Sequence, residues 1–272
     1  MPELPEVQTV VDTLRPKVLG RTIARVRLTR QDIVTPTSFD LASALTGRVI
    51  AATDRRGKRI VFSLDTGDRF YIHLGMTGRL TVQAAVEPAP PHTHLVLELS
   101  QMGDQIRFTD PRRFGGVWWL GRAQSPDGDM GPEPLRTRPP QLARRLAQTT
   151  RAIKNALLDQ KVLAGLGNIY VDESLFAAGI HPLAPANSLS SKQVGRLSRA
   201  IKSTLRRALR HRGSTFRDYR DADGAPGAFQ KLHRVYDREG QPCRKCRTPI
   251  QRIVLGSRST HFCPGCQPRS QV

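Results

Sequence analysis

The second and third residues of the chain, Pro2 and Glu3, are of types that together could do covalent chemistry. If Met1 is removed, Pro2 presents a secondary amine, and Glu3 places a carboxyl group within reach of the same substrate atom. Attack of that amine on C1′ of a sugar would expel an attached base and leave an iminium ion, which is an electron sink. An α-amino group titrates near ~7.7 to 8.0, and the positive end of a following helix lowers that pKa further. A proline at this position equally suits the plain role of helix entry.

Four cysteines form two pairs near the C-terminus, Cys243 with Cys246 and Cys263 with Cys266. Two C-x2-C turns at this separation have the spacing at which four thiolates converge on one tetrahedral zinc ion. The clustering argues against a secreted disulfide framework. A site closed by four protein ligands leaves no position for water, so we expect one structural Zn²⁺ and no catalytic metal.

The segment between the two cysteine pairs has the pattern of a β-hairpin. Apolar residues within 250–255 precede Gly256 and Ser257, and residues 260–262 lead back toward the second pair. This pattern places Arg258 at the hairpin tip, where a metal-held loop would present its guanidinium group to a groove.

The chain carries a large excess of positive charge. Its 272 residues include 43 Lys and Arg against 23 Asp and Glu, which gives a formal net charge of +20. This excess predicts a polyanionic partner. No stretch approaches the ~18 apolar residues of a membrane span, and the start, MPELPEVQTV, lacks the apolar core of a signal peptide. We therefore expect a cytoplasmic, nucleoid-associated protein with no membrane partner.

The pattern of the first half predicts a leading helix and a set of strands. Apolar residues recur at helical spacing after Pro5, which predicts a short helix over residues 5–14. Alternating apolar residues then predict seven short strands, at residues 23–28, 60–64, 70–74, 80–82, 95–99, 106–108 and 117–120. Short strands separated by Gly, Asp and Pro predict a β-sandwich.

The pattern changes after residue 123. Residues 124–140 are rich in Pro, Gly and Asp without periodicity, which is typical of a linker. Apolar residues from Val194 to Leu209 then form one helical stripe, and the opposite face of that helix is basic. Such a face is usually only solvated, but the global charge favours phosphate contact. The loop at 214–227 is too long for a turn and is predicted to be a mobile lid.

Seven ordered motifs run nearly from end to end of the chain. They are MPELPEV at the start, RRGK at 55–58, HLGMTG at 73–78, DPRRFG at 110–115, GPEPL at 131–135, GLGNIY at 165–170 and the four-cysteine ribbon. With these motifs the sequence resembles the formamidopyrimidine-DNA glycosylase family of bacterial DNA-repair enzymes. The departures are small: Gly57 replaces an alanine of many relatives, and Thr149 and Thr150 stand where some have lysines. A phosphate contact there would be weaker, or supplied by Arg151.

The resemblance implies an α+β multidomain fold with an N-terminal β-sandwich, a helical domain with a helix-two-turn-helix motif, and a C-terminal four-cysteine zinc ribbon. The expected bounds are 1–123 for the catalytic domain, 124–140 for the linker, 141–235 for the helical domain and 236–272 for the ribbon. The helical domain would include loop 214–227 as the cover of an everted 8-oxoguanine, and damaged double-stranded DNA would cross between the two halves. We expect a monomer without a small-molecule cofactor.

The resemblance also implies roles for single residues. Pro2 would be the Schiff-base nucleophile and Glu3 the proton donor. Lys58 would be a general acid or a phosphate contact during elimination, and Arg258 a phosphate contact and the donor for a second elimination. The expected DNA contacts are Met76, His92, Arg112, Phe114, Arg151, Lys154 and Asn168. Three of them, Met76, Arg112 and Phe114, would fill the space that a flipped base leaves.

These expectations describe a bifunctional DNA glycosylase and AP lyase of base excision repair that removes oxidised purines and then cleaves the strand by β,δ-elimination. Two alternatives stay open. An endonuclease VIII-like enzyme would share the catalytic residues and the ribbon but remove oxidised pyrimidines; Leu4, the complete hole-filling set and the long loop favour the purine branch. A non-catalytic zinc protein that binds bent DNA would show the same charge and ribbon, but it leaves the N-terminal residues unexplained.

Overall fold

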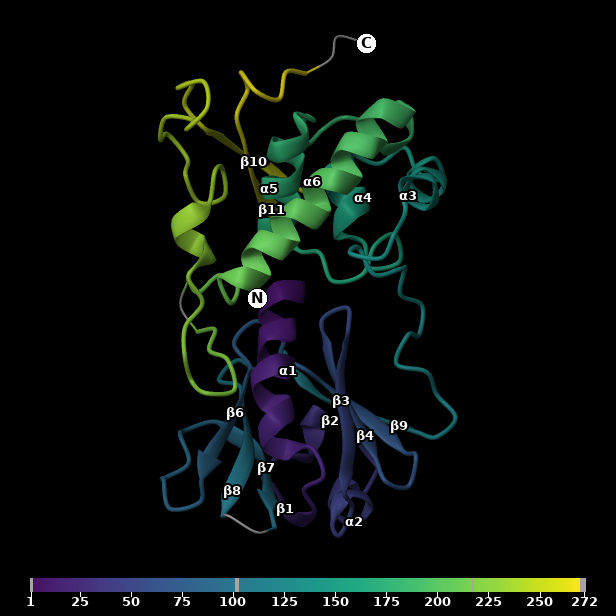
Figure 1. Cartoon of the computed structure of the whole chain (residues 1–272), viewed down its shortest axis with the longest axis vertical. Coiled ribbons are helices and arrows are strands. Elements are labelled where there is room, and N and C mark those ends of the chain that lie inside the picture. The colour runs from purple at the N-terminus through teal and green to yellow at the C-terminus, as the bar shows by residue number, and fades with distance from the viewer. Residues whose placement is uncertain (1, 101–102, 217, 270–272) are drawn as a thin grey trace. The chain divides into compact units, whose positions relative to one another are not determined.

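The chain divides into two compact units in a computed structural model that describes residues 2–100, 103–216 and 218–269 (Figure 1). The first unit comprises Met1–Gly128 with His211–Ala228, and the second comprises Asp129–Arg210 with Phe229–Val272. The loop at 214–227 therefore belongs to the first unit, whereas the prediction placed it with the helical domain. The reason is packing, because Tyr219 and Ala222 lie in the same buried cluster as the leading helix. The other predicted domain bounds stay a prediction.

Helix α1 (Leu4–Val18) opens the first unit. Its apolar residues at helical spacing, Val7, Val10, Val11 and Leu14, have no exposed surface and make one buried face, as predicted. The helix continues beyond residue 14 although Pro16 removes one backbone donor, because Val18 in the last turn is also fully buried in the core. The predicted helix was therefore too short by one turn.

Two sheets follow α1 in the first unit. A four-stranded sheet has the order β1-β7-β8-β6 and contains β1 (Ile23–Leu28), β6 (Arg79–Ala84), β7 (Thr93–Leu99) and β8 (Asp104–Thr109). A five-stranded sheet has the order β2-β9-β5-β4-β3 and contains β2 (Val34–Thr35), β3 (Ile50–Arg56), β4 (Arg59–Leu64), β5 (Arg69–His73) and β9 (Gly116–Gly121). The short helices η1 (Gln31–Ile33) and α2 (Leu41–Leu45) lie between early strands. All seven predicted strands are present, and β2 and β3 are additional.

The two sheets and α1 enclose one apolar core. At its centre Phe62 of β4 and Phe70 of β5 stack with parallel rings whose centroids lie 4.7 Å apart, and neither side chain is exposed. Such a pair adds attraction beyond the burial of its area. This core holds the strand ends and turns that carry the candidate residues of the first unit.

The second unit is mainly helical. It contains α3 (Pro139–Leu146), α4 (Ile153–Leu158), α5 (Asn168–Ala178), η2 (Ala186–Ser188), α6 (Ser191–Arg210) and η3 (Phe229–Leu232), followed by the hairpin of β10 (Gln251–Leu255) and β11 (Arg258–Phe262). Helix α5 packs against α4, α6 and β11. The predicted amphipathic helix and the predicted hairpin are both present, so the α+β class is confirmed. No helix in the described part of the chain is long and apolar enough to cross a membrane.

Replacing Phe62 with alanine should lower the free energy of unfolding by about 3–5 kcal/mol, because it leaves a cavity in a fully buried aromatic pair. Val86→Ala is the matched control, since Val86 is 92% exposed and its truncation should change stability by less than about 0.5 kcal/mol. Urea unfolding followed by circular dichroism measures both values. Equal effects of the two substitutions would contradict this account of the core.

Candidate functional site

Pro2 and Glu3 lie immediately before α1, and both residues are buried. The neighbouring Glu6 is 1% exposed, and its carboxylate connects two segments. Glu6 Oε2 accepts the N–H of Glu3 at 2.8 Å, and Glu6 Oε1 accepts the N–H of Ser214 at 2.7 Å. No role was predicted for Glu6 from the sequence, although a glutamate three residues after a helix start is a known capping signal.

Loop 214–227 packs closely against α1. The N–H of Ala222 donates to Thr13 Oγ1 at 3.1 Å, and the Tyr219 hydroxyl donates to the carbonyl of Glu6 at 3.2 Å. At the entry to the loop, Gly213 has φ +78°, and a Cβ there would lie 2.6 Å from Glu6 Oε1. Only glycine therefore fits at this point without displacing the carboxylate that holds Glu3.

Lys58 lies in a two-residue turn between β3 and β4, and its side chain is 8% exposed. The turn begins with Gly57 at φ +57°, as a tight hairpin turn requires. Arg55 ties this turn to α1, because its Nε donates to Gln8 Oε1 at 2.8 Å while its Nη1 donates to the Gly57 carbonyl at 2.9 Å. The turn that carries Lys58 is thus fixed beside the early turns of the helix that follows Pro2 and Glu3.

Met76, Arg112 and Phe114 lie on two adjacent turns of the first unit. Met76 is 37% exposed and Phe114 is 54% exposed, which is unusual for large apolar side chains. The Arg112 guanidinium lies over the Phe114 ring, 4.6 Å from its centroid. The turns touch through their backbones, since a Cβ on Gly75 would lie 2.4 Å from the backbone nitrogen of Gly115. The three predicted hole-filling residues are therefore brought onto one local surface.

Asp110, which is fully buried, fixes these two turns. Its Oδ2 accepts the N–H of Gly115 at 2.8 Å, and its Oδ1 accepts the Thr77 hydroxyl and, at 3.3 Å, the N–H of Arg112. The N–H of Asp110 donates to the carbonyl of His92, an exposed residue with φ +64°. Asp110 was part of a quoted motif, but no role was predicted for it.

His73 ends β5, just before the Met76 turn, and its Nδ1 accepts the N–H of Gly75 at 3.1 Å. Burial and then the nearby charges of Lys58 and Arg59 lower the pKa of His73 to about 4. The ring is therefore neutral at pH 7, which suits its role as an acceptor in this turn.

In the second unit, Lys154 and Asn168 both hold the backbone of the hairpin. Lys154 is fully buried, and its Nζ lies 2.7 Å from Asp172 Oδ1 and donates to the Ser259 carbonyl at 2.7 Å. Asn168, the first residue of α5, donates from Nδ2 to the same carbonyl at 2.9 Å. Asp172 Oδ2 also accepts the N–H of His261 at 2.9 Å. This burial argues against the predicted direct contact of Lys154 with DNA, because a covered ammonium group cannot reach a phosphate.

Arg258 is exposed and begins β11, next to the Ser259 carbonyl that Lys154 and Asn168 hold. The turn before it consists of Gly256 and Ser257 with φ +57° and +60°, the conformation typical of a two-residue hairpin turn. Arg258 therefore lies at the hairpin tip as predicted. Arg151, also exposed, pairs with Asp159 at 2.9 Å.

The four cysteines converge as predicted, with all Sγ atoms within 4.8 Å of one another. Sγ atoms lie 3.4 Å apart in Cys246 and Cys263 and 3.9 Å apart in Cys243 and Cys266, too far for disulfides of about 2.05 Å. Four metal–sulfur bonds of about 2.3 Å that point to the corners of a tetrahedron place the sulfur atoms about 3.8 Å from one another. Burial and the neighbouring thiols raise the pKa of Cys266 to about 12, and a cation would reverse this by stabilising thiolates. The cluster thus fits a structural metal.

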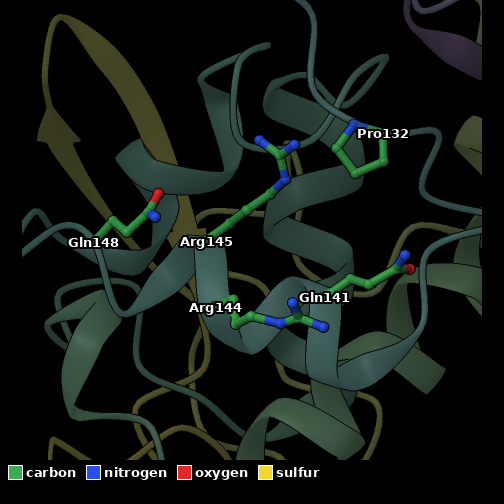
Figure 2. Close-up of a pocket in the computed structure, with 5 residues that line it drawn as sticks. All are labelled: Pro132, Gln141, Arg144, Arg145 and Gln148. Carbon is green, nitrogen blue, oxygen red and sulfur yellow. The ribbon is translucent and has the colours of Figure 1, made fainter.

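Two hollows lie elsewhere in the described part of the chain. One, of about 370 Å³, lies along α3 and is lined by Pro132, Gln141, Arg144, Arg145 and Gln148 (Figure 2). The other, of about 520 Å³, lies in the first unit between the end of α1 and β6. Apart from Asp223 of loop 214–227, which lines the second hollow, neither hollow is lined by a residue predicted above, so we do not assign the candidate site to either one.

The β-sheet unit led by α1, the helical unit and the hairpin with its cluster of four cysteines define a multidomain α+β protein with a four-cysteine finger. Three family models match in order along the chain. They are the formamidopyrimidine-DNA glycosylase N-terminal domain at residues 1–117, the H2TH domain of the same glycosylase at 130–220, and the zinc finger found in FPG and IleRS at 240–269. The chain belongs to the formamidopyrimidine-DNA glycosylase family, which confirms the resemblance.

Individual relatives match over nearly the whole chain. The formamidopyrimidine-DNA glycosylase of Geobacillus kaustophilus is 44% identical, with 98% of this chain and 100% of the relative covered. The crystal structure of the MutM (Fpg) protein from Thermus thermophilus has a TM-score of 0.88 and 42% identity and covers 99% of this chain and 100% of that one. A Lactococcus lactis Fpg mutant in complex with Fapy-dG-containing DNA has a TM-score of 0.92 and 34% identity, with 98% and 100% covered.

Removing the metal with a strong thiol-competing chelator should abolish the fixed position of the hairpin and weaken DNA binding by at least about tenfold, because structural four-cysteine sites contribute folding energy directly. Metal content by mass spectrometry and DNA affinity by anisotropy measure the two effects. Arg258→Ala is the control, which should weaken DNA binding while the metal content stays at one ion. Loss of metal in Arg258→Ala would contradict the placement of Arg258 at an exposed tip.

The free energy of unfolding should fall as the pH decreases from 6.5 to about 4. In this range the imidazole of His73 is protonated in the unfolded chain, whereas in the folded protein it stays neutral until the pH reaches about 4. In the His73→Asn variant, the fall in the free energy of unfolding between pH 6.5 and about 4 should be smaller than in the wild type, by at most about 3 kcal/mol. Asparagine keeps an acceptor for Gly75 and removes the titration. Urea unfolding at several pH values tests this, and parallel curves for the two proteins would show that the His73 pKa is not lowered.

Proposed function

We propose that the protein is a bifunctional DNA glycosylase and AP lyase of base excision repair that removes oxidised purines from duplex DNA. Solved relatives include Lactococcus lactis Fpg with abasic-site DNA and MutM with DNA containing carbocyclic 8-oxo-G. The observation that carries the proposal lies in one unit of this chain. Buried Pro2 and Glu3 precede α1, while Met76, Arg112 and Phe114 are exposed together on two fixed turns.

The first step forms a bond from the Pro2 nitrogen to C1′ of the damaged nucleotide. Once Met1 is removed, the neutral secondary amine attacks C1′, the bond from C1′ to the base breaks, and the base leaves with a proton. Glu3 gives a proton to the sugar ring oxygen as the ring opens, and the nitrogen and C1′ then share a double bond in an iminium ion. Glu3 is proposed as the proton donor because it directly follows Pro2 and is buried beside it at the start of α1.

The second step uses the iminium ion as an electron sink. Loss of a C2′ proton lets the bond from C3′ to its phosphate oxygen break, and a second elimination releases the 5′ phosphate. Water then cleaves the iminium bond and frees the amine. Lys58, fixed beside α1, and Arg258, at the hairpin tip, are the cations proposed to contact the phosphates that leave.

The exposed set of Met76, Arg112 and Phe114 supports base flipping. An extruded base leaves a gap whose unstacking costs a few kcal/mol unless side chains fill it. The Phe114 ring has the shape to wedge between base pairs, and Arg112 has the donors to hold the orphaned base. Asn168, at the start of α5, is proposed to contact backbone phosphate near the lesion, Arg151 is proposed as a further phosphate contact, and His92 as a weaker contact to DNA.

In the second unit we infer that the metal is a single Zn²⁺, because four thiolates at tetrahedral separations suit it. Cys243, Cys246, Cys263 and Cys266 would hold it, and it would supply shape and no chemistry. Lys154 is a positioning residue in this proposal. Together with Asn168 it sets the place of the hairpin backbone from which Arg258 projects.

Borohydride should trap a covalent adduct between the protein and a duplex containing 8-oxoguanine opposite cytosine, because it reduces the iminium ion to a stable amine. The Pro2→Gly variant should lose at least about 100-fold in adduct yield, since its primary amine lacks the ring that holds the attacking nitrogen. Denaturing electrophoresis measures the yield. Intact binding without any adduct in the wild type would support a non-catalytic DNA-binding protein instead.

The control variant is Arg25→Gln, an exposed substitution outside the candidate site that should leave the adduct yield unchanged. A duplex with thymine glycol distinguishes the two branches of the family. Faster excision of 8-oxoguanine supports the purine assignment, whereas faster excision of thymine glycol would replace it with an endonuclease VIII-like activity. Mass spectrometry of the active protein must show that Met1 is absent and the terminus is unblocked.

A further inference from the structure

Helix α6 carries an exposed row of basic side chains that the proposed function does not use. Its 20 residues include seven Lys or Arg and no Asp or Glu. Five of the basic residues are exposed and follow one another at helical spacing: Lys192, Arg196, Arg199, Arg206 and Arg210. At 3.6 residues per turn these five lie within an arc of about 80° and extend for about 27 Å. We call them the α6 row.

The buried face of α6 is on the opposite side. Val194, Leu197, Ile201 and Leu205 are nearly or fully buried, and the helix packs against α3 and α5. Figure 1 shows α6 as a long green helix with α5 beside it. Helix α5 in turn packs against β11, which begins with Arg258. Because the α6 row lies on the side of α6 away from α5, it faces away from the helix against which β11 packs.

Within the described residues, no ion pair or hydrogen bond engages the head groups of the α6 row. Elsewhere in the chain, acidic residues do neutralise arginines, as in the pairs of Arg15 with Asp54 and Arg151 with Asp159. Five like charges on one face repel each other, and this costs stability unless a partner neutralises them. The absence of acidic residues is therefore a feature of this helix and not of the chain.

The chemistry of the α6 row selects one kind of partner. No large hydrophobic side chain of α6 is exposed, so the face lacks the apolar anchors of a protein interface or of a membrane-bound helix. A straight row of cations matches the sugar-phosphate backbone of a duplex, which carries one negative charge for about every 1.7 Å of its axis. We propose that the α6 row binds the sugar-phosphate backbone of a second, undamaged DNA segment, so that the protein can pass directly from one segment to the other. This proposal rests on the proposed function only in taking DNA as the polyanionic partner.

Dissociation kinetics test this proposal without any excision. The full-length, metal-loaded protein is bound to a labelled undamaged duplex, and unlabelled duplex is added at increasing concentration. The observed dissociation rate of the wild type should rise in proportion to the competitor, since a second duplex binds before the first leaves. The variant Arg196→Gln/Arg199→Gln/Arg206→Gln should show a rate independent of competitor, and the salt slope of its weak binding phase should fall by about 3.

The control is Arg25→Gln/Arg48→Gln/Arg136→Gln, which removes the same charge from exposed, scattered positions and should behave as the wild type. A competitor-independent rate in the wild type would overturn the proposal. So would unchanged transfer in the α6 variant, or equal loss in the α6 variant and the control. Adduct formation with 8-oxoguanine should persist in the α6 variant, so failure of the glycosylase proposal and failure of this one remain separate results.

Discussion

The candidate functional segments of this structure depend on hydrogen bonds from backbone N–H groups to buried carboxylates. Glu6, Asp110, Asp172 and Glu173 are four of the carboxylates that are 3% exposed or less. A buried carboxylate is tolerated only when donors surround it, and each of these accepts backbone N–H groups. The donors belong to the loop after α6, the turn that carries Phe114, the hairpin strand β11 and the segment that follows η3. Hydrogen bonds that offset the cost of burying each charge thereby fix these segments, three of which lie outside helices and strands.

Much of the fold could be predicted because its signals are local. Alternation marks strands such as β4 and β7, and the C-x2-C pairs mark the metal cluster, since both patterns are complete within a few residues. Strand β3 was not predicted because only Ile50 and Thr53 of its seven residues are buried, so its sequence resembles that of a polar loop. It exists because β4 beside it supplies the hydrogen-bond ladder, and that partner is not visible in the pattern of β3 itself.

The sequence identified which residues form the candidate site, but it predicted their burial and their hydrogen-bond partners less well. Gly-flanked turns correctly suggested that Met76 and Phe114 are exposed. Nothing in the sequence shows that Lys154 is covered, because its partner Asp172 lies on another helix and a lone lysine resembles a surface charge. Glu6 was missed for a similar reason, since the N–H that it accepts from Ser214 is 208 residues away. Long-range polar pairing is a property of the folded chain, and no periodicity records it.

The contact between Gly75 and Gly115 has a mechanical consequence. Where two turns meet through bare backbone with no room for a methyl group, there is no compressible side chain between them, and neither turn can shift without the other. Asp110 adds hydrogen bonds from both turns to a single buried group. Met76 and Phe114 are therefore rigidly coupled to each other. A force on either side chain is passed through both turns to the β-sheets that carry them.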